Sequence, residues 1–160
     1  MSLPLSQHKI HAHDADDRIT LNYEDRFLRR KVLTSDSGLR FLADFPSTQS
    51  LDAGDAFVLN DGRKIGVRPA KEELLEVMGD DILRLAWHIG NRHMPCQIET
   101  NRLLIQRDHV IRDMLQKLGA ALCDVVEPFT PEGGAYGHGR THSHSHSHAH
   151  GEGHTHSHAH

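Results

Sequence analysis

The residues with the clearest chemical potential are the histidines at the C-terminal end of the chain. Ten of the 16 histidines lie between residues 138 and 160, most of them one residue apart. Imidazole is the commonest metal-ligating side chain and is largely neutral near pH 7. Small spacers let neighbouring rings turn toward one ion, so the segment is expected to bind nickel, zinc or copper. The expected ligands are His142, His144, His146, His148, His150, His154, His156, His158 and His160.

This His-rich tail has a second interpretation, because a histidine-rich C-terminus can be a purification tag. Tags are usually unbroken runs of histidine. Here the histidines alternate with Ser, Ala and Thr, and Gly151-Glu152-Gly153 interrupts them, which favours a natural tail. Residues 134–160 have almost nothing apolar to bury, so we expect them to be disordered without metal.

Three of the six remaining histidines lie near the N-terminus, at His8, His11 and His13, beside Asp14, Asp16 and Asp17. On a strand His11 and His13 would share one face, which would allow weak chelation. A solvated polar end of the chain is the simpler interpretation and is favoured.

The other three are His88, His93 and His109. His88 and His93 are five positions apart, which is roughly 140° around a helix, so they cannot chelate one ion there. A single histidine such as His93 is usually structural. On a two-fold axis, however, one histidine per subunit supplies two ligands to one ion. His109 is a further candidate ligand or merely an exposed residue.

Composition excludes several classes of function. Lys and Arg total 18 against 22 Asp and Glu, interspersed without a basic stripe, so nothing points to nucleic acid. Neither a membrane-spanning run nor a signal peptide is evident, so a cytoplasmic protein is expected. HExxH, Walker A, GxSxG and GxGxxG motifs are missing, and a flexible His repeat lacks the fixed ligands of a hydrolytic site. We therefore expect no enzyme activity. Cys96 could be a soft ligand, but a small buried thiol is favoured.

The first half of the chain is predicted to be all-β. Short alternating runs are separated by turns containing Gly38 and Gly62, and Pro46 is expected to end a strand. No helix is evident before Pro69. The expected strands cover residues 18–23, 31–34, 39–45, 56–59 and 64–67.

The second half mixes helices and strands. Asp80 or Asp81 is expected to cap a helix that ends before Pro95, and Asp108 to cap a second one that ends at Gly119. Strands are expected over residues 96–99, 102–106 and 121–126. Residues 71–78 have helical propensity, yet as a strand they complete a ferredoxin-like βαββαβ unit, which we prefer. The predicted fold is α+β, with a β-rich domain (1–70), a ferredoxin-like domain (71–133) and the tail (134–160).

Several segments of the chain match a known family, and the most specific of them is the histidine-containing run Trp87–Pro95. The matching segments are residues 35–38, 41–42, 54–55, 61–63, 87–95, 97–98 and 108–115. On these residues the chain resembles the UreE family of urease accessory proteins, which are nickel metallochaperones. The resemblance covers essentially residues 15–130.

The resemblance implies an N-terminal domain similar to a peptide-binding domain of Hsp40-type chaperones and a ferredoxin-like domain through which two copies form a homodimer. The family's metal-binding histidine falls on His93, which would meet its symmetry mate and bind Ni(II) as cargo, with Zn(II) or Cu(II) as competitors. The implied partners are a urease accessory GTPase and the urease apoenzyme complex.

One departure from the family concerns the second helix. Some members have His-Asp-His at its start, whereas this chain has Arg107-Asp108-His109, so His109 remains a secondary candidate. Two other functions stay open. One is a His-rich nickel or zinc buffer, and the other is a protein-binding module in which metal binding is secondary.

Overall fold

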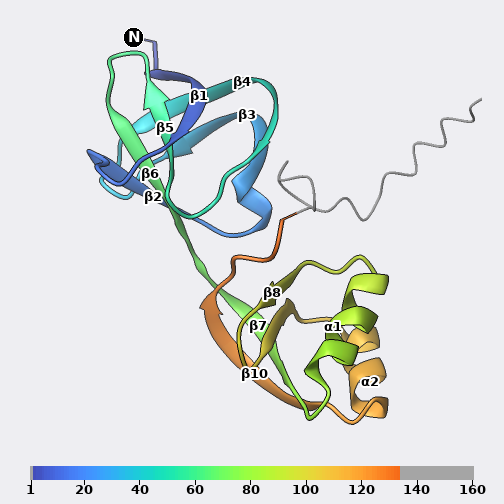
Figure 1. The fold of residues 1–160 in the computed structure, drawn as a ribbon. Helices are drawn as coiled ribbons and strands as arrows, with labels where there is room; N and C mark the ends of the chain where they lie inside the picture. Colours follow the sequence, from blue (N-terminus) through green and yellow to red (C-terminus); the bar gives the residue numbers. More distant parts are fainter. Residues whose placement is uncertain (1, 134–160) are drawn as a thin grey trace, which may run out of the picture.

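The computed structural model describes residues 2–133, which form two β-sheets with separate cores (Figure 1). The first half contains β1 (Leu5–His11), β2 (Asp17–Leu21), the 3-10 turn η1 (Glu24–Arg26), β3 (Phe27–Thr34), β4 (Arg40–Ser50), β5 (Asp55–Leu59) and β6 (Lys64–Pro69). The second half contains β7 (Lys71–Met78), α1 (Ile82–Asn91), β8 (Cys96–Ile98), β9 (Leu103–Gln106), α2 (His109–Lys117) and β10 (Ala121–Pro128). The α+β class predicted from the sequence is confirmed.

The N-terminal sheet has the strand order β2-β6-β5-β1-β4-β3. Gly38 and Gly62 occupy the two predicted hairpin turns with φ of 95° and 92°, a region that glycine enters without steric cost. The inward side chains form one apolar core, whose fully buried aromatic members are Phe41, Phe45 and Phe57. Alternation of apolar and polar residues thus places one face of most of these strands in the core.

Two details of the N-terminal sheet differ from the sequence prediction. The strand β1 was not anticipated, because its residues are mostly polar; it pairs parallel to β4 and antiparallel to β5. Pro46 was expected to end a strand, which is wrong, since β4 continues to Ser50. Proline is tolerated there because the register of β3 and β4 shifts near it, so no ladder donor is needed.

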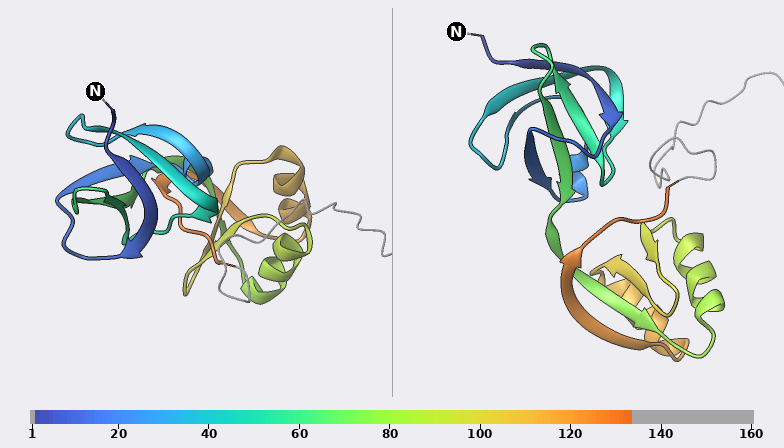
Figure 2. Two further views of the ribbon diagram at one scale, coloured as in Figure 1. Left: turned by 90° about the horizontal axis from the view of Figure 1, so that it is seen from above. Right: turned by 60° about the vertical axis from the view of Figure 1, so that its left-hand side comes forward.

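The C-terminal sheet has the strand order β10-β7-β9-β8, and its chain order is βαββαβ. Figure 2 shows both helices on the same side of this sheet. The preferred strand over residues 71–78 is confirmed, since every residue of β7 pairs with β10. Pairing on two sides and burial of Leu74, Leu75 and Val77 outweigh the helical propensity of this segment. Asp81 and Asp108 accept hydrogen bonds from the first turns of α1 and α2, as predicted.

The sheet face away from the helices is covered where the two domains meet. Leu74 and Leu104 of the sheet pack against Tyr23 and Phe129, which are buried and contact each other edge to face at 5.5 Å. The buried Arg26 donates hydrogen bonds to the carbonyl oxygens of Leu21 and Phe129. These contacts tie the segment after β10 to the N-terminal domain, toward which it turns in Figure 1.

Within residues 2–133, neither helix has the length and apolar character needed to cross a membrane.

We predict that Phe129→Ala lowers the free energy of unfolding by about 3–5 kcal/mol, because it removes a fully buried ring and its contact with Tyr23. Urea denaturation followed by circular dichroism measures the change. Val126→Ala is the matched control: this side chain is 58% exposed, so the expected loss is about 0.5 kcal/mol or less. Equal losses in the two variants would contradict the role given to Phe129.

Candidate functional site

His93 lies just beyond the C-terminal end of α1 in a backbone conformation that histidine seldom adopts. Its φ is 57°, and it is the one non-glycine residue among residues 2–133 with a positive φ. The amide of His93 donates to the carbonyl of Gly90 at 2.9 Å, and that of Met94 donates to Ile89 at 3.4 Å. These two bonds form a Schellman motif, whose left-handed position is usually glycine.

The left-handed conformation costs an L-residue about 1–2 kcal/mol relative to glycine. Local folding therefore favours glycine at position 93, and the histidine found there marks the position as a candidate for a functional role. Its side chain is exposed, so the ring is available to a ligand. The backbone geometry thus singles out His93 among the histidines of the described chain.

A cavity of about 190 Å³ lies beside His93. Its lining is mostly apolar and contains two other potential ligands, Cys96 and Glu132. Burial, together with the nearby charge of Glu132, raises the pKa of the Cys96 thiol to about 11, so the thiol is protonated near neutral pH. The interpretation of Cys96 as a small, largely buried thiol therefore fits better than that of a ready thiolate ligand.

The surface next to this cavity is apolar. Leu83 and Trp87 are 80% and 63% exposed and lie one helical turn apart on α1, and Ile98, which lines the cavity, is 53% exposed. The opposite side of α1 already fills the core through Leu85 and Ile89. Exposed large apolar side chains gathered in this way are typical of an interaction surface.

The other two histidines of this domain lie elsewhere. His88 lines a groove of about 560 Å³ between the two helices, together with Asp113, and its ring packs edge to face on Trp87 at 5.0 Å. His109 is exposed at the start of α2 and lines neither cavity. His88 and His93 therefore do not share a cavity, in keeping with their predicted separation around the helix.

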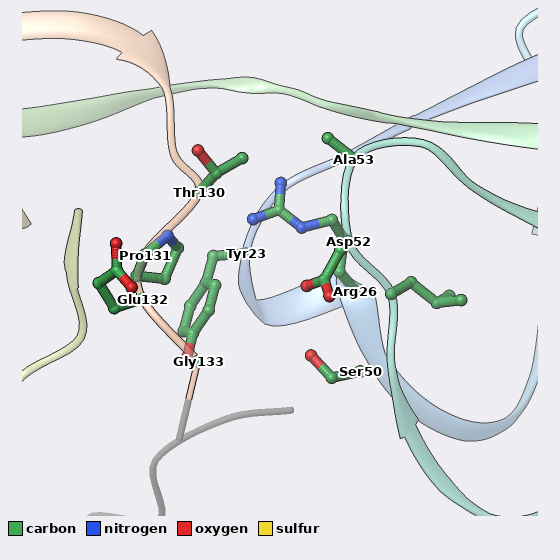
Figure 3. Close-up of a pocket in the computed structure, with 10 residues that line it drawn as sticks. Tyr23, Arg26, Ser50, Asp52, Ala53, Thr130, Pro131, Glu132 and Gly133 are labelled. Atoms are coloured by element: carbon green, nitrogen blue, oxygen red, sulfur yellow. The ribbon is translucent and has the colours of Figure 1, made fainter. Parts of the chain in front are cut away.

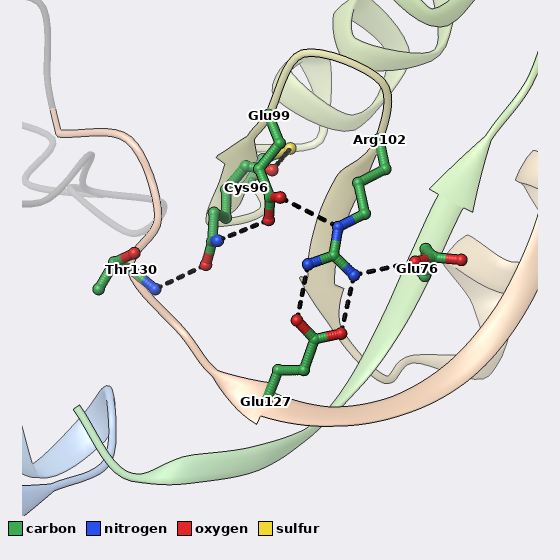
Figure 4. A network of polar contacts seen from close by, with 7 residues as sticks. Glu76, Cys96, Glu99, Arg102, Glu127 and Thr130 are labelled. Carbon is green, nitrogen blue, oxygen red and sulfur yellow. Dashed lines mark hydrogen bonds and ion pairs between the residues drawn. The ribbon is translucent and has the colours of Figure 1, made fainter.

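A network around Arg102 fixes the strands that follow His93 (Figure 4). The guanidinium makes ion pairs with Glu76, Glu99 and Glu127 at 2.6–3.1 Å. Its two hydrogen bonds to Glu127 lower the pKa of that carboxyl. The network lies on the sheet face away from the helices and links β7, β8–β9 and β10.

The last described residues connect this network to the His93 cavity. The amide of Thr130 donates to the side chain of Gln97 at 2.9 Å, and that of Glu132 donates to the carbonyl of Cys96 at 2.9 Å. A second cavity, of about 400 Å³, lies on the other side of residues 130–133, between the two domains. Figure 3 shows the guanidinium of Arg26 pointing toward Thr130 in this cavity. The chain therefore enters the tail from a fixed position next to His93.

The described residues alone do not make a complete metal centre. Across residues 2–133, no three His, Cys, Asp or Glu side chains are grouped so that they could hold one ion. The predicted tail ligands, His142 to His160, lie outside the described residues. A site at His93 would thus need ligands from a second copy or from the tail.

Comparison with known proteins identifies the family. The model of the N-terminal domain of UreE urease accessory proteins matches residues 4–70, and that of the C-terminal domain matches residues 72–160. The chain belongs to the UreE family. The urease accessory protein UreE of Ruegeria pomeroyi is 67% identical over 131 residues, covering 82% of this chain and 88% of that protein. UreE of Brucella abortus is 50% identical over 138 residues, covering 81% of each.

Membership in the UreE family makes this chain a urease accessory protein. The most specific resemblance in the sequence, residues 87–95, coincides with the second half of α1 and the turn holding His93. The family resemblance selected His93, but the sequence gave no sign of its positive φ or of Glu132 beside it. A glycine-like backbone position can be recognised in a sequence only when glycine occupies it.

We predict that His93→Gly is more stable than His93→Ala by about 1 kcal/mol, because only glycine adopts a positive φ without steric cost. Urea denaturation of the two variants measures the difference. The same pair of substitutions at His88, within α1, is the control and should give the opposite order, since glycine inside a helix is about 1 kcal/mol worse than alanine. The same order at both positions would contradict the Schellman geometry.

Proposed function

We propose that the protein is a nickel metallochaperone that binds Ni(II) through His93 and delivers it during assembly of the urease active site. The observation that carries the proposal is an exposed histidine in a strained, glycine-type position, next to an apolar surface, in a member of the UreE family. Strain retained at one position argues for a role that another residue could not fill. Zn(II) and Cu(II) would compete, because affinity alone does not favour nickel over copper.

The proposed site is completed by dimerisation. Two copies pair through the apolar surface of Leu83, Trp87 and Ile98, which brings the two His93 rings to one ion on the two-fold axis. This arrangement accounts for the lack of a three-ligand group within residues 2–133 of one chain. It also accounts for apolar side chains that would otherwise stay in water.

The tail supplies further ligands. His142, the first of the closely spaced histidines, lies ten positions after Glu132, which is beside His93. An extended chain of that length spans up to roughly 35 Å, so tail histidines can reach His93. Tail imidazoles that bind to and dissociate from the ion one at a time would let it pass to a partner without ever being free in solution. The proposed recipients are the urease apoenzyme and its accessory GTPase.

Nickel calorimetry on the chain truncated after Gly134 tests this function. We expect about one nickel per dimer, because each copy contributes one His93 to the two-fold site. His93→Gly should abolish this binding without loss of stability, whereas the control His88→Gln should leave it unchanged. If the truncated chain binds no nickel while the full chain binds several ions, the protein is instead a His-rich metal buffer.

We predict that Trp87→Glu weakens the dimer roughly 30-fold or more, as expected for a central aromatic contact worth about 2 kcal/mol. Sedimentation equilibrium measures the dissociation constant. Val126→Glu is the matched control, because it also places a negative charge at an exposed apolar position, here on β10. It should leave the dissociation constant of the dimer unchanged. A wild-type chain that stays monomeric at micromolar concentration with nickel present would refute the dimeric site.

A further inference from the structure

We propose that His11 and His13 form a second metal site, on the N-terminal domain, for a divalent transition ion of the nickel, copper or zinc type. The two imidazole rings lie 5.2 Å apart between centroids at the C-terminal end of β1. This site shares no residue with the His93 cavity and does not depend on the function proposed for it.

The backbone fixes the position of His11 at the end of β1. His11 pairs with Asp55 of β5, and the amide of Ala12 donates to the carbonyl of Gly54 at 3.0 Å. These pairings hold the end of β1 against the turn before β5. His13 lies two residues beyond the end of β1, in a bend, and this bend brings its ring beside that of His11.

A buried carboxylate orients the His11 ring. Nδ1 of His11 lies 3.4 Å from Oδ1 of Asp55, a side chain only 11% exposed. The other oxygen of Asp55 accepts hydrogen bonds from the amide of Asp52 at 2.9 Å and from Nζ of Lys9 at 3.1 Å, so the carboxylate is fixed. A carboxylate bound to one ring nitrogen holds the proton there and leaves the other nitrogen free for a metal, as in many metal sites.

Close packing against Gly54 restricts the same ring of His11. A Cβ atom added to Gly54 would lie 2.8 Å from Cε1 of His11, and Gly54 has a φ of 90°. Position 54 therefore has to be glycine both for its backbone and for the ring that lies over it. The side chain of His11 is nevertheless 63% exposed, so its outer edge faces solvent.

The separation of the rings suits a shared ion. With metal–nitrogen bonds of about 2.0–2.1 Å and a tetrahedral angle, two imidazole centroids on one ion lie roughly 5 Å apart. The observed 5.2 Å matches this value, although the rings are now edge to face at 84°, so that His13 has to turn about its side-chain bonds. His11 is held at the end of β1, so only His13 and the bend that carries it have to adjust.

The ligand set defines the kind of site. Two imidazoles favour borderline ions over magnesium or calcium, which prefer oxygen ligands. Within residues 2–133 no third His, Cys, Asp or Glu joins them, so water fills the remaining positions. Such a site binds weakly and exchanges its ion readily.

Nuclear magnetic resonance of the ¹⁵N-labelled full chain tests the site separately from the tail. Cu²⁺ is added until the tail signals have broadened completely. The signals of the amides of residues 11–14 and 54–56 are then followed as more Cu²⁺ is added. We expect these amides to broaden in the wild type. In His13→Gln and in His11→Gln, the Cu²⁺ concentration needed to broaden these amides should rise at least roughly 10–100-fold. That is the loss of metal affinity expected when even a supporting group is removed.

His8→Gln is the matched control, because His8 lies on the same strand but pairs with Val58, away from the other two rings. It should leave the broadening unchanged, as should His93→Gly, which removes only the ligand of the proposed carrier site. The unshifted amides elsewhere in each spectrum report that the variant is folded. Amides that stay sharp in the wild type, or broaden equally in His13→Gln, would overturn the proposal.

Discussion

The architecture depends on covering the second face of the four-stranded sheet. The two helices bury one face, and the other carries Leu74 and Leu104, which water would otherwise reach. Tyr23 from the first domain and Phe129 from the segment after β10 close this face together. The buried guanidinium of Arg26 holds the carbonyl of Phe129, which leaves residues 130–133 little freedom in where they run. Those residues pass the His93 cavity, so interdomain packing determines where the tail begins.

Most of the fold could be predicted from the sequence, and the exceptions have physical reasons. Hairpins with glycine at left-handed positions and helices capped by aspartate are local signals, and they place nearly all the strands and both helices. The strand β1 is held by pairing on both sides rather than by its own apolar residues, so its polar sequence conceals it. Likewise, Pro46 would end the strand only if its backbone nitrogen had to donate a hydrogen bond to the neighbouring strand. Whether it must depends on the register of β3 and β4, which the sequence does not reveal.

The candidate site was predictable to a smaller extent. His93 could be selected by its family motif, but the geometry that distinguishes it, a left-handed backbone in a Schellman turn, is invisible in the sequence because glycine is absent. Glu132 lies beside His93 because the segment after β10 is held by Arg26 at Phe129 and by a hydrogen bond from the Glu132 amide to the carbonyl of Cys96. The histidine pair at positions 11 and 13 was noted for its spacing alone; the contacts of Asp55 and Gly54 that fix one of its rings are tertiary.

The positive φ of His93 also limits which residues can replace it in other sequences. Glycine enters the left-handed region without steric cost, and asparagine and aspartate, like histidine, are enriched there, whereas β-branched or bulky residues are genuine outliers. Substitutions that preserve folding at this position therefore include several that discard the imidazole. A chain carrying one of them would keep the fold of both domains, yet lack the ligand on which the proposed carrier site depends. Selection for stability would therefore not preserve the proposed nickel site, and in any related sequence the residue aligned with His93 tests that proposal more directly than overall similarity does.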